Sequence, residues 1–176
     1  METSFIFQQS VYEDSRGVFS PLPLSFPTTS DVRLQKKWVQ SNISVNPNKG
    51  TFRGMHFQEP FAQSKLVKVI NGEIIDFLLD LRKESPTYGE VSKWLINRDS
   101  ALYVPKGFAH GFLTLFDDTV VQYLVDEVWV KDCEHIINPY SIDLVNVEIN
   151  THFKPSDLII SEKDLNGRRF NHYFKT

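Results

Sequence analysis

The sequence predicts an all-β fold, an antiparallel jelly-roll barrel with a short helical segment near the C-terminus. Three observations support this prediction. Short runs rich in β-branched and aromatic residues recur along the chain, turn-forming residues separate them, and Asn71-Gly72 divides two of the longest runs. About ten strands at this spacing need a closed or double-sheet arrangement to bury their apolar faces.

The N-terminal part of the chain differs from the rest. The run PLPLSFPTTS, residues 21–30, contains three prolines, which lack a backbone donor and do not suit a central strand. We therefore expect approximately residues 1–30 to form an extended arm that contacts a second subunit, so that the protein is a homodimer.

The expected strands follow this arm. In chain order they cover residues 36–45, 51–58, 65–70, 73–81, 90–96, 101–105, 111–116, 119–125, 134–138 and 144–149. Asn71-Gly72 is a strong hairpin signal, because a type I′ turn needs positive φ at both central residues, and Asp117-Asp118 marks a weaker turn. Only SEKDL, residues 161–165, is predicted to be helical, with Ser161 as its N-cap.

Composition limits the class of protein. The chain has 176 residues, 41% of them hydrophobic and 23% charged, which predicts one globular domain over residues 1–176. A net charge of −3 gives no general attraction to nucleic acid or to an anionic membrane, so an anionic ligand needs a local site. We expect no signal peptide and no membrane span. The single Cys133 has no partner for a disulfide or a zinc site, which favours a cytoplasmic location.

One motif combines fold and chemistry. The segment YVPKGFAHGF contains Pro105-x-Gly107-x-x-His110, a spacing that forms a tight turn and delivers a histidine to a barrel interior. It resembles the second motif of the cupin family, whose first motif carries His-x-His and a nearby glutamate that bind a metal. Here the matching place is His56-Phe57-Gln58, and an amide is a poor ligand for a transition metal. We therefore expect a cupin-type barrel that has no metal and no other cofactor.

Four segments extend the resemblance beyond the fold. In chain order, these segments resemble the signature segments of the dTDP-4-dehydrorhamnose 3,5-epimerase family: FRGMHFQ, KLVKVINGEIIDFLLDLRKESPTYG, VPKGFAHGF and ISEKDL. The resemblance runs from about Arg16 to about Asp164. It implies a metal-free isomerase that acts on a nucleotide-linked 4-keto-6-deoxy sugar in deoxysugar and polysaccharide biosynthesis.

The resemblance also implies catalytic roles. Inversion of a carbon beside a ketone needs a base, a group that stabilises the enolate and an acid on the opposite face. In the family the base corresponds to His56, and Asp164 would orient its imidazole. Lys65 corresponds to the lysine beside the C4 oxygen of the sugar, and Tyr123 to the tyrosine that returns a proton.

Further residues match the family's substrate-binding positions. Arg53 matches the arginine that holds the pyrophosphate, a role suited to a planar guanidinium. A strictly alternating strand places Arg53 and His56 on opposite faces, so either Gly54 marks a bulge or Arg53 lies at the barrel mouth. The other matching positions are His110, Gln40, Asn42 and Asp76, together with Arg16 and Phe19, which would reach the nucleotide of the neighbouring subunit.

Departures from the family pattern keep the substrate open. Trp129 stands where the family has a second tyrosine, Ser20-Pro21 replaces a pair of glutamates, and the segment 138–149 differs throughout. The alternatives are a C3-only or C5-only epimerase, a sugar-nucleotide 3,4-ketoisomerase and a non-catalytic sugar-nucleotide-binding cupin. A metal-dependent dioxygenase is disfavoured by Gln58.

Overall fold

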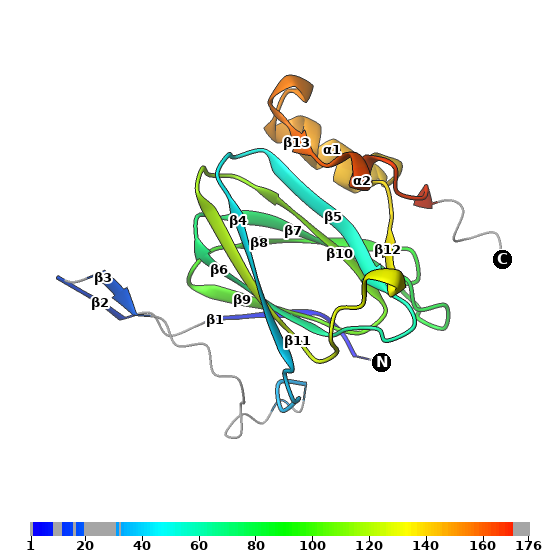
Figure 1. Cartoon of the computed structure of the whole chain (residues 1–176), viewed down its shortest axis with the longest axis horizontal. Helices are drawn as coiled ribbons and strands as arrows, with labels where there is room; N and C mark the ends of the chain where they lie inside the picture. Colours follow the sequence, from blue (N-terminus) through cyan, green and yellow to red (C-terminus); the bar gives the residue numbers. More distant parts are fainter. Residues whose placement is uncertain (1, 9–11, 16, 20–30, 32, 171–176) are drawn as a thin grey trace.

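The computed structural model describes residues 2–8, 12–15, 17–19, 31 and 33–170, and its main body consists of two antiparallel sheets that face each other (Figure 1). The five-stranded sheet has the spatial order β1 (Phe5–Gln8), β9 (Ser100–Val104), β6 (Lys65–Asn71), β11 (Thr119–Val125) and β4 (Gln40–Asn46). The second sheet has the order β12 (Glu134–Ile136), β5 (Thr51–Gln58), β10 (Phe108–Thr114), β7 (Ile74–Asp80) and β8 (Val91–Ile96), and β13 (Ile159–Ile160) pairs in parallel with β5. The expected all-β jelly-roll class is therefore confirmed.

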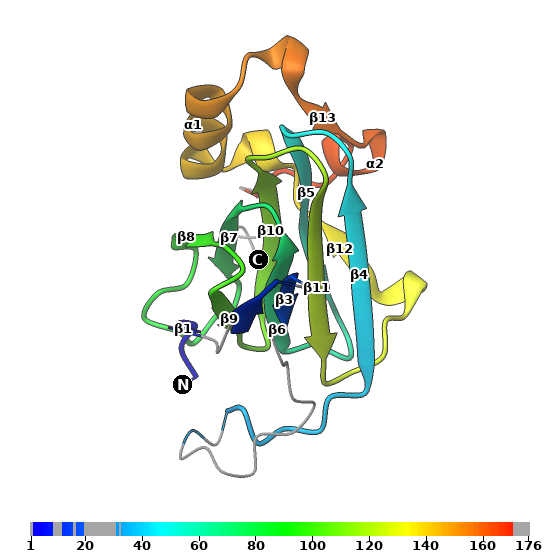
Figure 2. The same cartoon turned by 90° about the vertical axis from the view of Figure 1, so that its left-hand side faces the viewer.

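The helices lie near the C-terminal end of the chain, beside the second sheet (Figures 1 and 2). They are α1 (Asp143–His152) and α2 (Glu162–Leu165), with three single 3-10 turns at Lys131–Cys133, Pro139–Ser141 and Pro155–Asp157. In the described ranges, no helix is long and apolar enough to cross a membrane.

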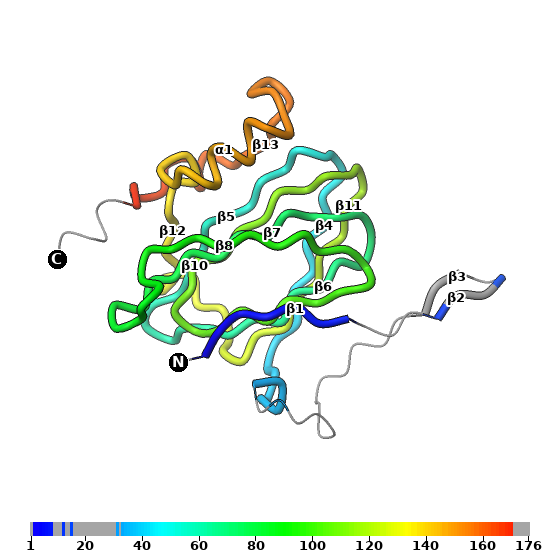
Figure 3. Tube along the Cα trace, turned by 180° about the vertical axis from the view of Figure 1, so that it is seen from behind, coloured from blue at the N-terminus to red at the C-terminus, as the bar shows by residue number. Residues whose placement is uncertain are grey.

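Apolar side chains fill three layers of the molecule. The central layer lies between the two sheets, which Figure 3 shows from behind, and includes Val67, Leu78 and Phe112. A second layer packs α1 against the outer face of the second sheet through residues such as Phe77 and Ile149. A third layer covers part of the outer face of the five-stranded sheet. Both sheets are therefore buried on more than one face, as their nearly continuous apolar runs require.

The strand expected at 144–149 is wrong, because residues 143–152 form α1. Val145 and Ile149 are buried one helical turn apart and Val147 is exposed, whereas a strand would place all three on one face. The outer face of the second sheet needs an apolar cover. Tertiary packing therefore overrides the β-propensity of valine and isoleucine here.

The hairpin expected at Asn71-Gly72 is also wrong. The turn is present and Gly72 has φ +85°, but β6 and β7 belong to different sheets and do not pair. Asp117-Asp118 likewise joins β10 of one sheet to β11 of the other. In a jelly roll a tight turn can carry the chain across the core, because each strand finds its partners far away in sequence.

The N-terminal part is only partly described. Strands β2 (Tyr12–Asp14) and β3 (Gly17–Phe19) form a small hairpin that lies away from the two sheets (Figure 1). The proline-rich run 21–30 and Arg16 lie outside the described residues, as does the side chain of Phe19.

Candidate active site

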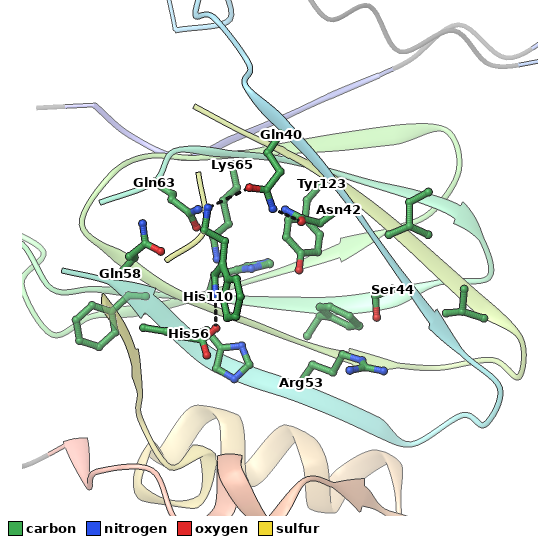
Figure 4. A pocket seen from close by; sticks show the side chains of 16 residues that line it. Gln40, Asn42, Ser44, Arg53, His56, Gln58, Gln63, Lys65, His110 and Tyr123 are labelled. Carbon is green, nitrogen blue, oxygen red and sulfur yellow. Dashed lines mark hydrogen bonds between the residues drawn. The ribbon is translucent and has the colours of Figure 1, made fainter. Parts of the chain in front are cut away.

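A pocket of about 400 Å³ opens between the two sheets (Figure 4). Side chains from β4, β6 and β11 form one wall, and side chains from β5 and β10 form the facing wall. The lining residues are Gln40, Asn42, Ile43, Ser44, Val45, Arg53, His56, Phe57, Gln58, Gln63, Lys65, His110, Phe112, Tyr123, Trp129 and Glu134.

A bulge in β5 places Arg53 and His56 in the same pocket. His56 pairs with His110 and Arg53 with Phe112, so β5 has one residue more than β10 over this stretch. At Gly54, φ is +126° and a Cβ would lie 2.5 Å from Cα of Gly111, so only glycine fits. Of the two arrangements left open by the sequence, the structure has the bulge.

His56 and Asp164 form a hydrogen-bonded pair. His56 Nε2 lies 2.7 Å from Asp164 Oδ1, and Asp164 Oδ2 accepts the backbone N–H of Gly54 at 3.1 Å. Burial of Asp164 opposes its ionisation, but the hydrogen bond and charge of His56, with the Gly54 N–H, hold its pKa below the ordinary value. The pair therefore combines an ionised carboxylate with an imidazole that is partly open to the pocket.

Helix α2 delivers Asp164 to this position. Ser161 caps the helix, since its side chain accepts the backbone N–H of Asp164 at 3.1 Å. The expected helix at 161–165 and its N-cap are confirmed. The same short helix thus fixes the backbone of Asp164 and, with it, the carboxylate that His56 contacts.

A second pair, His110 and Asp76, is buried deeper in the pocket. His110 Nε2 lies 2.8 Å from Asp76 Oδ2, and both side chains are excluded from solvent. Burial lowers the pKa of His110 against the opposing charge of Asp76, and burial raises the pKa of Asp76. Burial thus favours the neutral form of the His110 imidazole, which stays hydrogen-bonded to Asp76.

Lys65 and Tyr123 lie side by side on the wall formed by the five-stranded sheet. Lys65 Nζ is 6.0 Å from the centre of the Tyr123 ring. Burial lowers the pKa of Lys65 to about 8, although the charges of Asp76 and Glu134 oppose this shift. Burial also raises the pKa of the Tyr123 phenol, against the opposing charge of Arg53. At neutral pH the pocket thus contains an ammonium group beside a phenol that keeps its proton.

Arg53 is held by a residue that the sequence analysis missed. Its Nε donates to Asn46 Oδ1 at 2.7 Å, and the buried Asn46 donates in turn to the backbone carbonyls of Ser44 and Thr119. Asn46 is the last residue of β4, and Arg53 lies on β5 of the other sheet. Their contact depends on how the two sheets pack, and no motif in the sequence indicates it. The guanidinium is a cation at the pocket wall, suited to an anionic group of a ligand.

Trp129 and Glu134 lie at the pocket mouth. The indole Nε1 donates to Glu134 Oε1 at 3.1 Å, and Glu134 forms an ion pair with Lys163. Burial opposes ionisation of Glu134, but the hydrogen bond from Lys163 keeps its pKa below the ordinary value. Glu134 was not predicted as a site residue. Its one sequence signal is a carboxylate at the start of a short strand.

The structure gathers most of the predicted site residues. The predicted residues that line the pocket are His56, Lys65, Tyr123, Arg53, His110, Gln40, Asn42 and Trp129. Asp164 and Asp76 lie behind the two histidines and are hydrogen-bonded to them. Their chemical roles remain predictions, as do those of Arg16 and Phe19.

Gln58 does not present a free ligand atom. Its Nε2 donates to the carbonyls of Phe61 and Val128, and its Oε1 accepts the N–H of Val130. Among the residues that the structure describes, no three histidine, cysteine, aspartate or glutamate side chains are grouped as a metal would require. Metal independence remains a prediction for experiment.

Known proteins resemble this chain over nearly its whole length. The sequence pattern of the dTDP-4-dehydrorhamnose 3,5-epimerase family matches residues 1–172. The chain is 36% identical over 170 residues to the dTDP-4-dehydrorhamnose 3,5-epimerase of Methanothermobacter thermautotrophicus, covering 96% of this chain and 90% of the relative.

Two solved structures share the fold. One is dTDP-6-deoxy-D-glucose-3,5-epimerase from Legionella pneumophila in complex with dTDP-4-keto-L-rhamnose, with a TM-score of 0.76, 27% identity, and coverage of 96% of this chain and 88% of the other. The other is a 3′-monoepimerase from Streptomyces bikiniensis in complex with dTDP-quinovose, with a TM-score of 0.76, 25% identity, and coverage of 94% and 82%. By its sequence pattern and its relatives, this chain belongs to the dTDP-4-dehydrorhamnose 3,5-epimerase family.

Proposed function

We propose that this protein epimerises a thymidine diphosphate-linked 4-keto-6-deoxy sugar of the dTDP-4-dehydro-6-deoxyglucose type, at C3 and C5. One observation supports this above all others. His56, hydrogen-bonded to Asp164 of α2, lies on the second sheet, and Tyr123 lies on the facing sheet, so a sugar ring between them has a base on one side and an acid on the other.

The proposed reaction follows from this placement. His56 removes the proton beside the C4 ketone, and Asp164 stabilises the imidazolium that forms. The electron pair moves onto the C4 oxygen, where the Lys65 ammonium and the neutral His110 stabilise the enolate. Tyr123 then donates its proton to the same carbon from the opposite face, so the centre is inverted and the ketone is restored. His56 next releases the abstracted proton to solvent and the Tyr123 phenolate takes one up from solvent, which restores both groups for the second centre. No oxidant or reductant is needed.

Substrate binding is assigned to the mouth of the pocket. Arg53, held by Asn46, supplies a cation for the diphosphate. The indole of Trp129 supplies an aromatic surface for the base of the nucleotide, and Gln40 and Asn42 supply polar groups from the edge strand β4. The complex of the Legionella pneumophila relative with dTDP-4-keto-L-rhamnose supports this class of ligand.

A single-centre epimerase is the second candidate. The Streptomyces bikiniensis relative is a 3′-monoepimerase on the same fold, and inversion of both centres requires the sugar ring to move between steps. Trp129 lines the pocket at a position where the family has a smaller aromatic residue. A sugar-nucleotide 3,4-ketoisomerase or a non-catalytic sugar-binding cupin gives no inverted product, which separates both from the epimerases.

The experiment is incubation of purified protein with dTDP-4-dehydro-6-deoxyglucose, followed by proton NMR of the sugar. Coupling constants of the product show which centres have inverted, and inversion at C3 and C5 is expected. His56→Ala is expected to lose this conversion while it still binds dTDP. Recovery of unchanged sugar from the wild-type protein contradicts the proposal. Iron or zinc bound in stoichiometric amount would overturn the metal-free mechanism.

A homodimer, in the cytoplasm, is part of the same proposal. The small β2–β3 hairpin lies away from the main body (Figure 1), and β4 is an edge strand that exposes Ile43 and Val45. Unpaired edges and exposed apolar side chains favour association with a second copy. Sedimentation at micromolar concentration is expected to give a dimer, and a monomer would count against this arrangement. The single cysteine supports a reducing compartment.

A further inference from the structure

The segment Glu127–Val130 forms part of the pocket mouth although it has no regular secondary structure. It follows β11 and carries Trp129, whose side chain is 45% exposed. A segment of this kind ordinarily leaves its backbone groups to solvent and is free to move. Here, however, glutamine side chains bind the backbone of all four residues.

Gln58 makes two hydrogen bonds to this segment and a third to Phe61. It is only 5% exposed, its Nε2 donates to Val128 O at 3.2 Å and to Phe61 O at 2.7 Å, and its Oε1 accepts Val130 N–H at 2.8 Å. Both polar atoms of the amide are therefore engaged with backbone. Gln58 cannot also direct its amide at a ligand without releasing the segment.

Two further glutamines complete the arrangement. Gln63 Nε2 donates to Glu127 O at 2.8 Å, and Gln40 Oε1 accepts Trp129 N–H at 3.0 Å. Gln40 comes from β4 and Gln63 from the segment before β6, whereas Gln58 ends β5; Figure 4 labels all three side chains at the pocket. Three separate parts of the chain therefore bind one short segment. The indole itself is oriented by its bond to Glu134.

We propose that Gln58, assisted by Gln63 and Gln40, is a positioning residue that holds Glu127–Val130 in a preformed conformation and so presents Trp129 to the nucleotide. This inference rests on the proposed function for the role of Trp129. A preformed contact surface improves binding because its ordering is completed before the ligand arrives. The effect of Gln58 therefore falls on substrate binding, while the proton-handling groups deeper in the pocket are unaffected.

The test compares Gln58→Met with the wild-type protein. Methionine has a similar length but makes none of the three hydrogen bonds. We expect KM for the nucleotide sugar to rise about tenfold, the equivalent of about 1.4 kcal/mol, with kcat little changed. Gln63→Met, which loses one partly buried hydrogen bond, is expected to show a smaller rise in KM and guards against a failure of Gln58→Met to fold. Gln122→Met is the matched control, because Gln122 lies on β11 and its amide donates to Ser41 Oγ in an exposed hydrogen bond.

A double variant separates positioning from a general loss of stability. If Gln58 acts through Trp129, then Gln58→Met adds little to the KM increase already caused by Trp129→Ala. The inference would be overturned if the KM increases of the two single variants multiply in the double variant. It would also be overturned by an unchanged KM in both Gln58→Met and Gln63→Met, or by a fall in kcat without a change in KM.

A spectroscopic readout keeps the inference testable apart from the reaction. Quenching of Trp129 fluorescence by acrylamide, identified by comparison with Trp129→Phe, is expected to increase in Gln58→Met and to stay unchanged in Gln122→Met. Equal quenching in all these proteins would show that Gln58 does not hold the segment. If the wild-type protein turns over no nucleotide sugar but Gln58→Met still shows more quenching than the wild-type protein, only the proposed function is refuted.

Discussion

The substitution Asp164→Asn tests how the catalytic pair works. In the structure Asp164 accepts two hydrogen bonds, one from Gly54 N–H at 3.1 Å and one with His56 Nε2 at 2.7 Å. While Nε2 carries its hydrogen toward the carboxylate, Nδ1 has a free electron pair and can accept the substrate proton. Asparagine has nearly the same shape but only one acceptor oxygen.

The expected loss follows from these two bonds. Gly54 N–H can only donate, so it retains the single oxygen of the substituted side chain and turns the amide NH₂ toward His56 Nε2. The imidazole must then accept at Nε2 and carry its hydrogen at Nδ1, which is the wrong tautomer for a base. Loss of one charge-assisted hydrogen bond alone is equivalent to about 1.5–3 kcal/mol, or about 10- to 100-fold in rate. The tautomer change adds to this, and in a serine protease triad the same substitution lowers kcat about 10⁴-fold.

We therefore expect Asp164→Asn to lower kcat by about 10²- to 10⁴-fold while the affinity for dTDP, measured by calorimetry, stays near the wild-type value. Glu162→Gln is the matched control, because Glu162 is an exposed carboxylate on the same short helix. A kcat for Asp164→Asn within a few-fold of the control would refute the assignment of Asp164 as the partner of the base.

Three further predictions concern other parts of the molecule. Arg53→Ala is expected to weaken dTDP binding by about 10- to 100-fold, since a charge-assisted contact is lost, with kcat changed much less; calorimetry and steady-state kinetics measure both. Lys65, whose pKa is about 8, is expected to cause a fall in kcat as pH rises through 8, and this limb should be absent from the residual activity of Lys65→Met. The pKa of Lys65 in the folded state lies below the unfolded value of about 10.4, so between these two pH values the unfolded chain binds more protons than the folded chain. The free energy of unfolding should therefore rise with pH over this range, and Lys65→Met should remove this rise. Ile149→Ala, which opens a cavity between α1 and the second sheet, is expected to lower the free energy of unfolding by about 2–4 kcal/mol in urea, whereas the exposed Val147→Ala should change it little.

Most strands between residues 51 and 125 could be predicted from sequence because their runs are rich in β-branched and aromatic residues, whereas β1, β2, β3 and β13 were not expected. The run 51–58 matches β5 to the residue, and the ends of β6, β7, β8 and β9 differ from expectation by only one residue each. Helix α1 could not be predicted from β-propensity. The spacing of Ile142, Val145 and Ile149 does contain a helical signal, but alternation at 145, 147 and 149 favours a strand equally well.

The pairing of the strands was harder to predict from the sequence than their positions. Asn71-Gly72 is a correct turn, yet the identity of the partner strand depends on which sheet each strand enters, and that is decided by contacts far apart in sequence. The bulge that brings Arg53 and His56 together could be suspected from Gly54 alone. Its existence became evident only from the register against β10.

The site could be predicted where a motif carries it. His56, Lys65, His110 and Asp164 stand in segments that resemble a family, whereas Asn46, Glu134 and Gln63 enter the site only through the fold. Asn46 contacts Arg53 only seven residues away, and Glu134 contacts Trp129 only five residues away, whereas Gln63 contacts Glu127 across 64 residues. No motif marks any of these three contacts.

The most direct measurement of the central claim is solvent exchange in heavy water. Wild-type protein is incubated with dTDP-4-dehydro-6-deoxyglucose in D₂O, and the sugar is examined by NMR alongside samples with His56→Ala and with no protein. We expect deuterium at C3 and at C5 with the wild-type protein and at neither position above background with His56→Ala. Deuterium at one centre alone would identify a single-centre epimerase. Absence of deuterium from both centres, on this and on other nucleotide carriers, would show that the protein is not an epimerase of this sugar. Equal incorporation by His56→Ala would show that His56 is not the base.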